Sequence, residues 1–256
     1  MTLGRRSAEA AVGILPIALV LALWQGLAVS GIAPAVILPP PTAVFARLFQ
    51  QFGNAQYWDS FGITLFRLFA GFSIAVVIGV ALGVAATGSR TVEALVKPLV
   101  RVLAPLPKVA LYPAMVLILG FDDASKITLV AADAVFPILL ATYQGTSAVE
   151  PKLVWSARAA GCSQRRALFT VVLMAALPSV LTGCRIGLII SCIVVFLAEM
   201  ITSTDGLGYL LVRASRNFQT VDMFVPLISI SILGLTLNAA FNMLRAYLLR
   251  GFPEER

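Results

Sequence analysis

The sequence predicts an all-α, polytopic membrane protein with about six transmembrane helices, folded as a single domain over residues 1–256. Hydrophobic residues make up 59% of the chain and charged residues only 12%, and the mean hydropathy is +0.94. This composition is far from that of a soluble domain. Apolar runs of about 20 residues, long enough to cross a bilayer, recur along the chain, and their short connections leave no room for a second, soluble domain.

The net charge of +7 has a simple explanation in a membrane protein. In a soluble protein it would suggest nucleic-acid binding. Here the basic residues gather in the connections on one side, where the positive-inside rule and anionic lipid favour them. We therefore expect membrane lipid, and no nucleic acid, among the partners.

Residue types needed for catalysis are scarce. Histidine is absent, which removes the commonest metal ligand and general base. The chain has no G-x-x-x-x-G-K-S/T phosphate loop, so we expect no nucleotide hydrolysis by the chain itself. Cys162, Cys184 and Cys192 lack metal-ligand spacing and are expected to be free thiols. The sequence thus predicts a chain that is not an enzyme and has no metal site or cofactor of its own.

The first expected span is Ala10–Val29. A cleaved signal peptide is the alternative, because Ala28-Val29-Ser30 resembles a cleavage site. The length of the apolar run and the interfacial Trp24 and Gln25 favour a retained helix. In the polar interval that follows, Thr42–Gln51 has apolar residues at helical spacing and predicts either a short surface helix or a plain connector.

The second expected span is Ile63–Thr87, with Arg67 near its start, where a long side chain can snorkel to the interface. Gly71, Gly79 and Gly83 fall at near-helical spacing on this span. Small residues in such a row permit close approach of a neighbouring helix.

The third expected span, Leu99–Leu119, follows a charged cytoplasmic connection, Gly88–Val100, and is the least regular. Several prolines break it, and Lys108 lies in its middle. Irregular backbone at membrane depth is tolerated where protein buries it or water reaches it, so this span is a candidate to line a pathway. Alternatively, the prolines lie in a shallow cytoplasmic segment and the span begins near Val109.

The remaining expected spans are Ile127–Tyr143, Ala175–Thr202 and Met223–Leu244, and the fifth and sixth are joined by an outer loop, Ser203–Asp222. Ionisable residues inside spans are costly and mark pathways or helix contacts. The candidate pathway residues are therefore Lys108, Asp133, Arg185 and Glu199. A structural hydrogen bond by Asp133 and a snorkelling inner-face anchor at Arg185 are the alternatives.

A basic, Gly-punctuated segment, Glu150–Pro178, separates the fourth span from the fifth. Pro151 suits the first turn of a helix and Gly161 the left-handed turn that ends one, and Ser163 can cap the next helix. The pattern predicts a helix over Pro151–Ala160, a sharp turn and a second helix. This arrangement would make a lever on the membrane helices, whereas the alternative is an ordinary basic loop.

Positive charge predicts the orientation. With both termini in the cytoplasm, the outer side receives few of the 19 basic residues: Arg47, Arg67, Lys126, Arg213 and Arg216. The asymmetry favours six spans with the 150–166 segment facing the cytoplasm.

Several motifs along the chain resemble a known family. They are Leu38-Pro39-Pro40-Pro41-Thr42, Ala124-Ser125-Lys126-Ile127, Ser156-Ala157-Arg158, Gly161, Arg165-Arg166, Ala176-Leu177-Pro178, Gly183-Cys184-Arg185, Ala198-Glu199-Met200 and Asp205-Gly206-Leu207-Gly208-Tyr209. This set is similar to the permease subunits of binding-protein-dependent ABC importers, in the nitrate, sulfonate and taurine branch. One departure is that the family loop usually opens with Glu-Ala-Ala, whereas here Trp155 and Ser156 stand at the first two positions.

The resemblance implies a type I ABC importer permease fold with a cytoplasmic coupling loop at residues 148–168. It implies a second permease copy, two cytosolic ATPase subunits that carry ATP and Mg, and an extracytoplasmic solute-binding protein, in a bacterial inner membrane. ATPase-coupling contacts would fall on Ser156, Ala157, Arg158 and Gly161, with Arg165 and Arg166 as secondary contacts. The solute would be small and anionic, such as a sulfonate, taurine or nitrate. Its identity, and whether the two permeases are identical, stay open.

The rival function is a stand-alone secondary transporter or channel that uses Asp133 and Glu199 as ion or proton sites. No internal repeat of the span pattern supports it. Dependence on an ATPase partner separates the two functions. A membrane enzyme is disfavoured because no cluster of nucleophile, base or metal ligands is visible.

Overall fold

The computed structural model describes residues 3–32, 34 and 36–252, with side chains from Leu15 onward. Throughout this part of the chain the regular secondary structure is helical. The helices are α1 (Leu3–Val29), α2 (Pro41–Gln51), α3 (Ala55–Gly88), α4 (Arg90–Leu103), η1 (Lys108–Leu111), α5 (Tyr112–Leu119), α6 (Asp123–Ser147), α7 (Pro151–Ala159), α8 (Gln164–Ala167), η2 (Leu168–Val172), α9 (Leu173–Ala175), α10 (Leu177–Thr202), α11 (Leu207–Arg216) and α12 (Thr220–Leu248). The terminal Arg256, which contributes to the expected orientation, lies outside the described residues, as do the side chains of Arg5 and Arg6.

Four helices, α3, α6, α10 and α12, are each long and apolar enough to cross a membrane. A fifth span is formed if α4 and the η1–α5 segment, which are bent by 85° relative to each other, are taken together. The first expected span, Ala10–Val29, corresponds to the shorter apolar stretch Leu15–Val29 of α1. The all-α, polytopic membrane class predicted from composition is confirmed.

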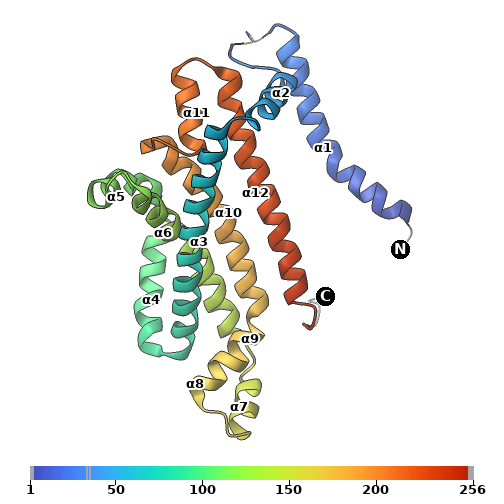
Figure 1. The fold of residues 1–256 in the computed structure, drawn as a ribbon. Helices are drawn as coiled ribbons and strands as arrows, with labels where there is room; N and C mark the ends of the chain where they lie inside the picture. Colours follow the sequence, from blue (N-terminus) through green and yellow to red (C-terminus); the bar gives the residue numbers. More distant parts are fainter. Residues whose placement is uncertain (1–2, 33, 35, 253–256) are drawn as a thin grey trace.

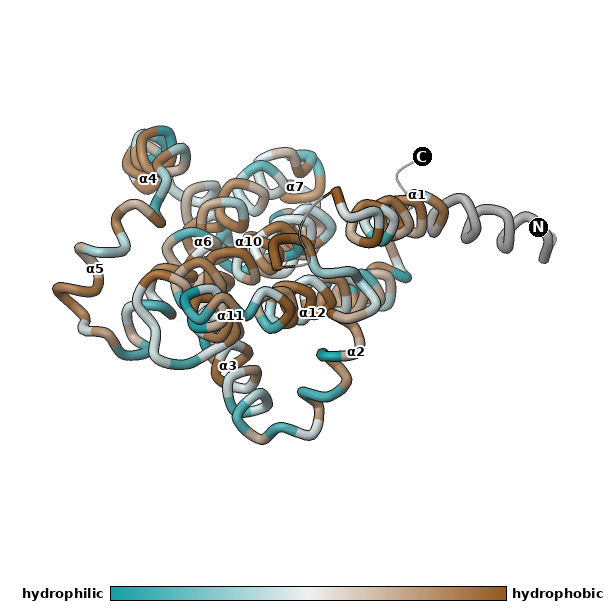
Figure 2. The backbone as a smooth tube through the Cα atoms, turned by 90° about the horizontal axis from the view of Figure 1, so that it is seen from above, coloured by the Kyte–Doolittle hydropathy of each residue, from teal (hydrophilic) through white to brown (hydrophobic). Residues whose placement is uncertain are grey.

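The long helices α3, α6, α10 and α12 run roughly side by side, with α7 and α8 at one end and α2 and α11 at the other (Figure 1). We call these the α7 end and the α11 end. Figure 2 shows α1 and α4 on opposite sides of the central group. Helix α1 contacts α2, and Trp24 packs near Phe224 of α12 with ring centroids 5.3 Å apart. From Leu15 onward most of its other apolar side chains are exposed, as suits a lipid-facing helix.

Helices α3 and α6 form the most extensive helix contact. Glycines of α3 allow the two helices to approach closely. A Cβ atom placed on Gly71 would lie 2.6 Å from Cγ1 of Val130, and one on Gly83 would lie 2.7 Å from Cβ of Thr142. Gly79 meets Ile138 in the same way. The close approach expected from the glycine spacing is confirmed, since side chains of α6 pack directly against the glycine backbone of α3.

The third span differs from expectation. Most of Gly88–Val100, expected as a connection, is helical, because α4 begins at Arg90. Glu93 accepts a hydrogen bond of 2.6 Å from the Tyr143 hydroxyl group of α6, which brings the first half of α4 against the bundle. The helix then ends at Leu103 because two of the prolines follow directly, and the chain turns sharply toward α5.

The outer loop also differs. Within Ser203–Asp222 the structure has a helix, α11, that begins directly after Gly206, whose φ is +93°. Leu207 and Ala214 are buried on its inner face, whereas its polar side chains are exposed. Its amphipathic pattern was hidden by the polar and Gly-rich residues around it. The expected surface helix over Thr42–Gln51 is confirmed as α2.

Candidate functional site

The segment between α6 and α10 forms an elbow, which we define as residues 150–166. Pro151 lies in the first turn of α7, and Gly161 has φ +88° directly after that helix. The N–H of Gly161 donates to the carbonyl of Arg158 at 3.0 Å, and the N–H of Cys162 donates to the carbonyl of Ala157 at 3.0 Å. This pair of bonds is a Schellman motif, in which the left-handed glycine closes the helix. The expected turn is confirmed, although α7 ends at Ala159 rather than Ala160.

The second arm of the elbow is helical from Gln164. The Ser163 hydroxyl oxygen accepts a hydrogen bond of 3.3 Å from the N–H of Arg166, as expected for an N-cap. From there α8, the π-helical turn η2 and α9 lead almost without interruption into α10, whose first turn contains Pro178. A movement of the elbow would therefore be transmitted to α10 on one side and to α6 on the other.

The elbow is largely uncovered. No residue of α7 is buried, and the helix contacts only α8 and η2 closely. Ser156, Arg158, Gly161, Arg165 and Arg166 are exposed, and Ala157 is half-buried. The six expected coupling residues thus gather on one accessible segment at the α7 end.

Apolar side chains are exposed beside these basic groups. Trp155 is 66% exposed, and Leu153 and Phe169 are exposed to a similar degree. Between the elbow and the ends of α3 and α6 lies a groove of about 670 Å³, lined in part by Trp155, Arg165 and Thr146. A short helix without buried residues, with an exposed tryptophan, is typical of a surface that a partner covers.

The α11 end holds a buried network around Arg67. This residue is 2% exposed, and Glu199 is 1% exposed. The Arg67 guanidinium group pairs with Glu199 at 2.9 Å and Asp123 at 2.7 Å, and also with Asp205. These carboxylates come from α10, the start of α6 and the α10–α11 connection, so one side chain of α3 holds three other segments.

Further hydrogen bonds complete this network. The Thr64 hydroxyl group donates to the carboxylate of Glu199 at 2.9 Å and accepts from the N–H of Leu207 at 2.9 Å. The N–H of Gly208 donates to Glu199 at 3.0 Å. Arg67, Glu199 and Thr64 thus all have hydrogen-bond partners, which makes burial of the charges tolerable.

Arg67 was misjudged from sequence alone. It does not snorkel to an interface, because it is enclosed and paired with carboxylates. A charge one turn inside a span requires a partner, and the acidic residues Glu199 and Asp205 near the outer ends of other elements were the available signal. Sequence gave no means of telling which acidic residue lies opposite Arg67.

The other charged candidates inside the bundle are also paired. Lys108, in η1, donates to Asp133 of α6 at 3.0 Å and to the carbonyl groups of Ala104 and Leu106 near the end of α4. Arg185 of α10 donates to Asn238 of α12 at 2.8 Å. The structure thus brings Lys108 and Asp133 together and leaves Arg185 and Glu199 apart from them. A role for these four residues in a pathway stays a prediction.

The described residues contain no group of three or more Cys, Asp or Glu side chains placed to hold a metal ion. Cys162, Cys184 and Cys192 are free thiols. The architecture suits relative movement of helices. It combines apolar helices long enough to span a membrane, an α11 end held by buried ion pairs and an exposed elbow at the α7 end.

Apolar helices able to cross a membrane, joined by an exposed elbow, are the architecture expected of a membrane transport permease. A family model described as "Binding-protein-dependent transport system inner membrane component" matches residues 75–252. The chain belongs to this family.

Curated relatives and solved structures agree. The chain is 29% identical to the taurine transport system permease protein TauC of Escherichia coli (strain K12), over 93% of this chain and 89% of the relative. It is 32% identical to a protein of the same organism named as an aliphatic sulfonates transport permease, SsuC, over 93% of this chain and 90% of the relative. A chain of the inward-facing MetNI methionine ABC transporter shares the fold, with a TM-score of 0.59, 21% identity, and coverage of 75% of this chain and 93% of that chain.

Proposed function

We propose that this chain is the permease subunit of an ATP-driven importer for a small anionic solute of the sulfonate, taurine or nitrate class. It would work in a bacterial inner membrane with two cytosolic ATPase subunits, which carry ATP and Mg, and with an extracytoplasmic solute-binding protein. A second copy of the chain would complete the pathway. Family membership supports the transport role, and the names of the relatives TauC and SsuC support the solute class.

The observation that carries the proposal is the elbow. Its glycine turn fixes the angle between α7 and α8, while its surface is exposed, basic and partly apolar. An aromatic anchor surrounded by arginines is the composition that interfaces favour. We assign the ATPase contact to Ser156, Ala157, Arg158 and Gly161, with Arg165 and Arg166 at its edge.

Orientation follows from charge. The basic residues are concentrated toward the α7 end, and the positive-inside rule puts that end in the cytoplasm, where ATP is available. Both termini would then be cytoplasmic, and the α11 end would face the solute-binding protein.

The elbow would work as a lever. Binding of ATP draws the two ATPase subunits together, and each carries its docked elbow with it. Since the elbow joins α6 directly and α10 through α8, η2 and α9, its displacement would tilt the helices that form the bundle core. ATP can drive this change only by favouring the state in which the ATPases are closed.

The experiment compares two glycines with the same backbone requirement. Gly161 after α7 and Gly31 after α1 have φ of +88° and +77°, and a Cβ at either would meet no atom within 4 Å. Valine at either position is strained by about 1–3 kcal/mol without a clash. We expect Gly161→Val to lose ATPase co-purification and ATP-driven uptake in proteoliposomes that contain the binding protein, and Gly31→Val to keep both.

Equal losses in the two variants would contradict a specific role of the elbow. If no ATPase co-purifies with the wild-type chain and the reconstituted protein moves solute without ATP, the importer assignment fails and a secondary transporter takes its place.

A further inference from the structure

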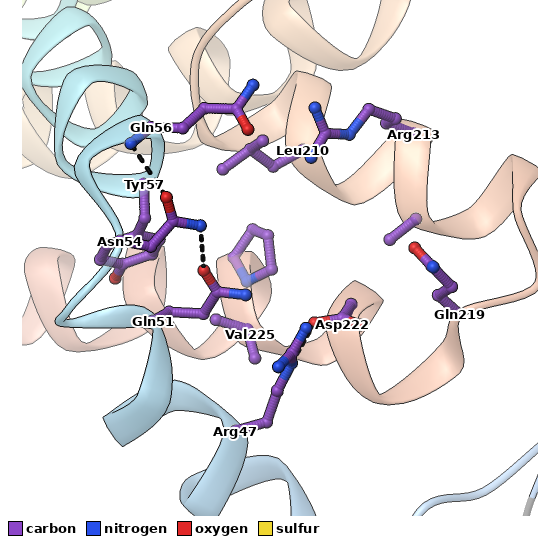
Figure 3. Close-up of a pocket in the computed structure, with 12 residues that line it drawn as sticks. Arg47, Gln51, Asn54, Gln56, Tyr57, Leu210, Arg213, Gln219, Asp222 and Val225 are labelled. Atoms are coloured by element: carbon purple, nitrogen blue, oxygen red, sulfur yellow. Dashed lines mark hydrogen bonds and ion pairs between the residues drawn. The ribbon is translucent and has the colours of Figure 1, made fainter.

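A small polar pocket lies at the α11 end, apart from both the elbow and the Arg67 network. It has a volume of about 260 Å³ and is formed where α2, the start of α3, α11 and the start of α12 converge (Figure 3). Sites for drug-sized ligands are usually about 300–1,000 Å³. This pocket therefore suits a small solute only.

The exposed lining of the pocket is mostly polar, with a smaller apolar part. Leu210, Val225 and Pro226 contribute the apolar part. The carboxamide side chains of Gln51 and Gln56 also line the pocket (Figure 3). A cavity of this kind matches an amphipathic molecule with a short hydrocarbon part and a polar head.

The charges around the pocket favour an anion. Arg47 is paired with Asp222 at 2.6 Å, so these two charges balance each other. Arg213 has no carboxylate partner among the described residues, and its guanidinium group lies 5.8 Å from the centre of the Tyr209 ring. Figure 3 shows this group directed across Leu210 toward Gln56. The lining thus has one positive charge that no carboxylate of the described residues balances.

The side-chain amide of Gln51 supplies a second hydrogen-bond donor in addition to Arg213. Asn54 accepts from the N–H of Gln56 at 3.1 Å and donates to the side-chain oxygen of Gln51 at 2.8 Å. These bonds orient Gln51 so that its amide nitrogen points toward the pocket interior (Figure 3). Guanidinium and amide N–H groups are the donors that recognise sulfonate, phosphate and carboxylate oxygens.

We propose that this pocket is a binding subsite for a short-chain organic sulfonate at the α11 end, with Arg213 and Gln51 holding the sulfonate oxygens and Leu210, Val225 and Pro226 contacting the alkyl group. The proposal rests on the proposed function, in which the α11 end receives solute from the binding protein. It gives the permease its own contact with the solute and makes Arg213 a specificity-determining residue. An anionic lipid headgroup has related chemistry, so the test must separate the two.

The test measures ligand binding to the purified full-length chain in neutral detergent, with no binding protein present. Saturation-transfer NMR and calorimetric titration would use ethanesulfonate, with ethylammonium as the cation of similar size and sn-glycerol 3-phosphate as the headgroup probe. We expect ethanesulfonate to bind and the two other probes to bind much more weakly. Arg213→Gln should raise the dissociation constant about tenfold, since a charge-assisted hydrogen bond is lost.

Arg216→Gln is the matched control. It removes an equal charge from the same helix at an exposed position that does not line the pocket. We expect less than about a twofold effect, because an exposed charge that makes no contact with the ligand is screened by water and salt. The proposal is overturned if ethanesulfonate does not bind, if both variants weaken it equally, or if either other probe binds as well. ATPase co-purification separates failure of the subsite from failure of the importer assignment. If only the subsite is wrong, the ATPase still co-purifies with the wild type and with Arg213→Gln. If the importer assignment is wrong, no ATPase co-purifies even with the wild type.

Discussion

The two ends of the bundle are built on opposite principles. At the α11 end, Arg67 and Glu199 are buried and bonded to α3, α6, α10 and the start of α11. At the α7 end, the elbow has no buried residue in α7 and is held through its connections to α6 and α10. The difference indicates that one end fixes the relative positions of the helices and the other is free to dock and move.

The largest expected effect comes from breaking the buried ion pair. Arg67→Met leaves Glu199 buried without its countercharge, which typically costs about 3–5 kcal/mol. We expect a large fall in the thermal unfolding midpoint and in the yield of folded protein. Arg47→Met, which disrupts a partly exposed pair with Asp222, should cost less than about 1 kcal/mol.

A double variant sharpens this prediction. Removing both charges with Arg67→Met and Glu199→Leu should recover part of the lost stability, because Asp123 and Asp205 are partly exposed and can be solvated. A double variant no more stable than Arg67→Met alone would argue against charge pairing as the cause.

The next effect concerns the α3–α6 contact. Gly71→Ala forces a Cβ within 2.6 Å of Val130, whereas Gly62→Ala on the same helix meets no atom within 4 Å. We expect about 1–3 kcal/mol of destabilisation from the first substitution, owing to overpacking. The second should be neutral or slightly stabilising, since alanine is the better helix former. Chemical or thermal unfolding of the pair in the same detergent measures both, and equal stability of the two variants would contradict the observed packing.

At the α7 end the expected effect is on association rather than stability. Trp155→Ala removes a side chain that is 66% exposed, so the unfolding midpoint should change little. As an aromatic anchor at an interface, its loss should weaken ATPase association by about 2 kcal/mol. Surface-immobilised binding measurements would use Phe121→Ala, an exposed aromatic at the α11 end, as the control. An equal loss of ATPase affinity in Phe121→Ala would contradict the assignment of ATPase docking to the α7 end alone.

The smallest effect is a pH dependence. Burial acts to raise the pKa of Asp205, but its hydrogen bond to Arg67 and the nearby charge outweigh this and hold that pKa below its ordinary value. A lowered folded-state pKa means that the stabilising contribution is present above the unfolded pKa, about 4, and is lost as the pH falls through the lower, folded value. Because the Asp205 side chain is 42% exposed, the contribution should be well under 1 kcal/mol.

Asp205→Asn should therefore flatten the decline in stability below about pH 4 and leave the behaviour near neutral pH almost unchanged. Thermal unfolding midpoints measured across the acidic range check this. A steeper decline in the variant than in the wild type would reverse the assigned sign.

Local features of the fold were predictable from the sequence because local chemistry determines them. Gly161, Ser163 and Pro151 specify the elbow through backbone conformation and capping, and the row from Gly71 to Gly83 specifies a close helix contact. The start of α4 was missed because its charged residues resemble those of a loop, although Glu93 is bonded to Tyr143 of α6.

The candidate site was predictable only where it is contiguous in sequence. All six elbow residues lie between Ser156 and Arg166, whereas the Arg67 network joins Arg67 to carboxylates 56 to 138 positions away. Pairing over such distances depends on how the helices pack. For the same reason, the pocket lined by Gln51 and Arg213 could not be found before α2, α3, α11 and α12 were placed around it.

The most direct test of the account replaces one exposed serine at each end with a photoreactive amino acid. Ser156 lies on α7 and Ser215 on α11, and both are exposed. In membranes that contain the ATPase, illumination should cross-link the probe at position 156 to the ATPase subunit and leave the probe at position 215 without that product. Cross-linking to the ATPase from position 215, or its absence from position 156, would contradict both the orientation and the docking role of the elbow.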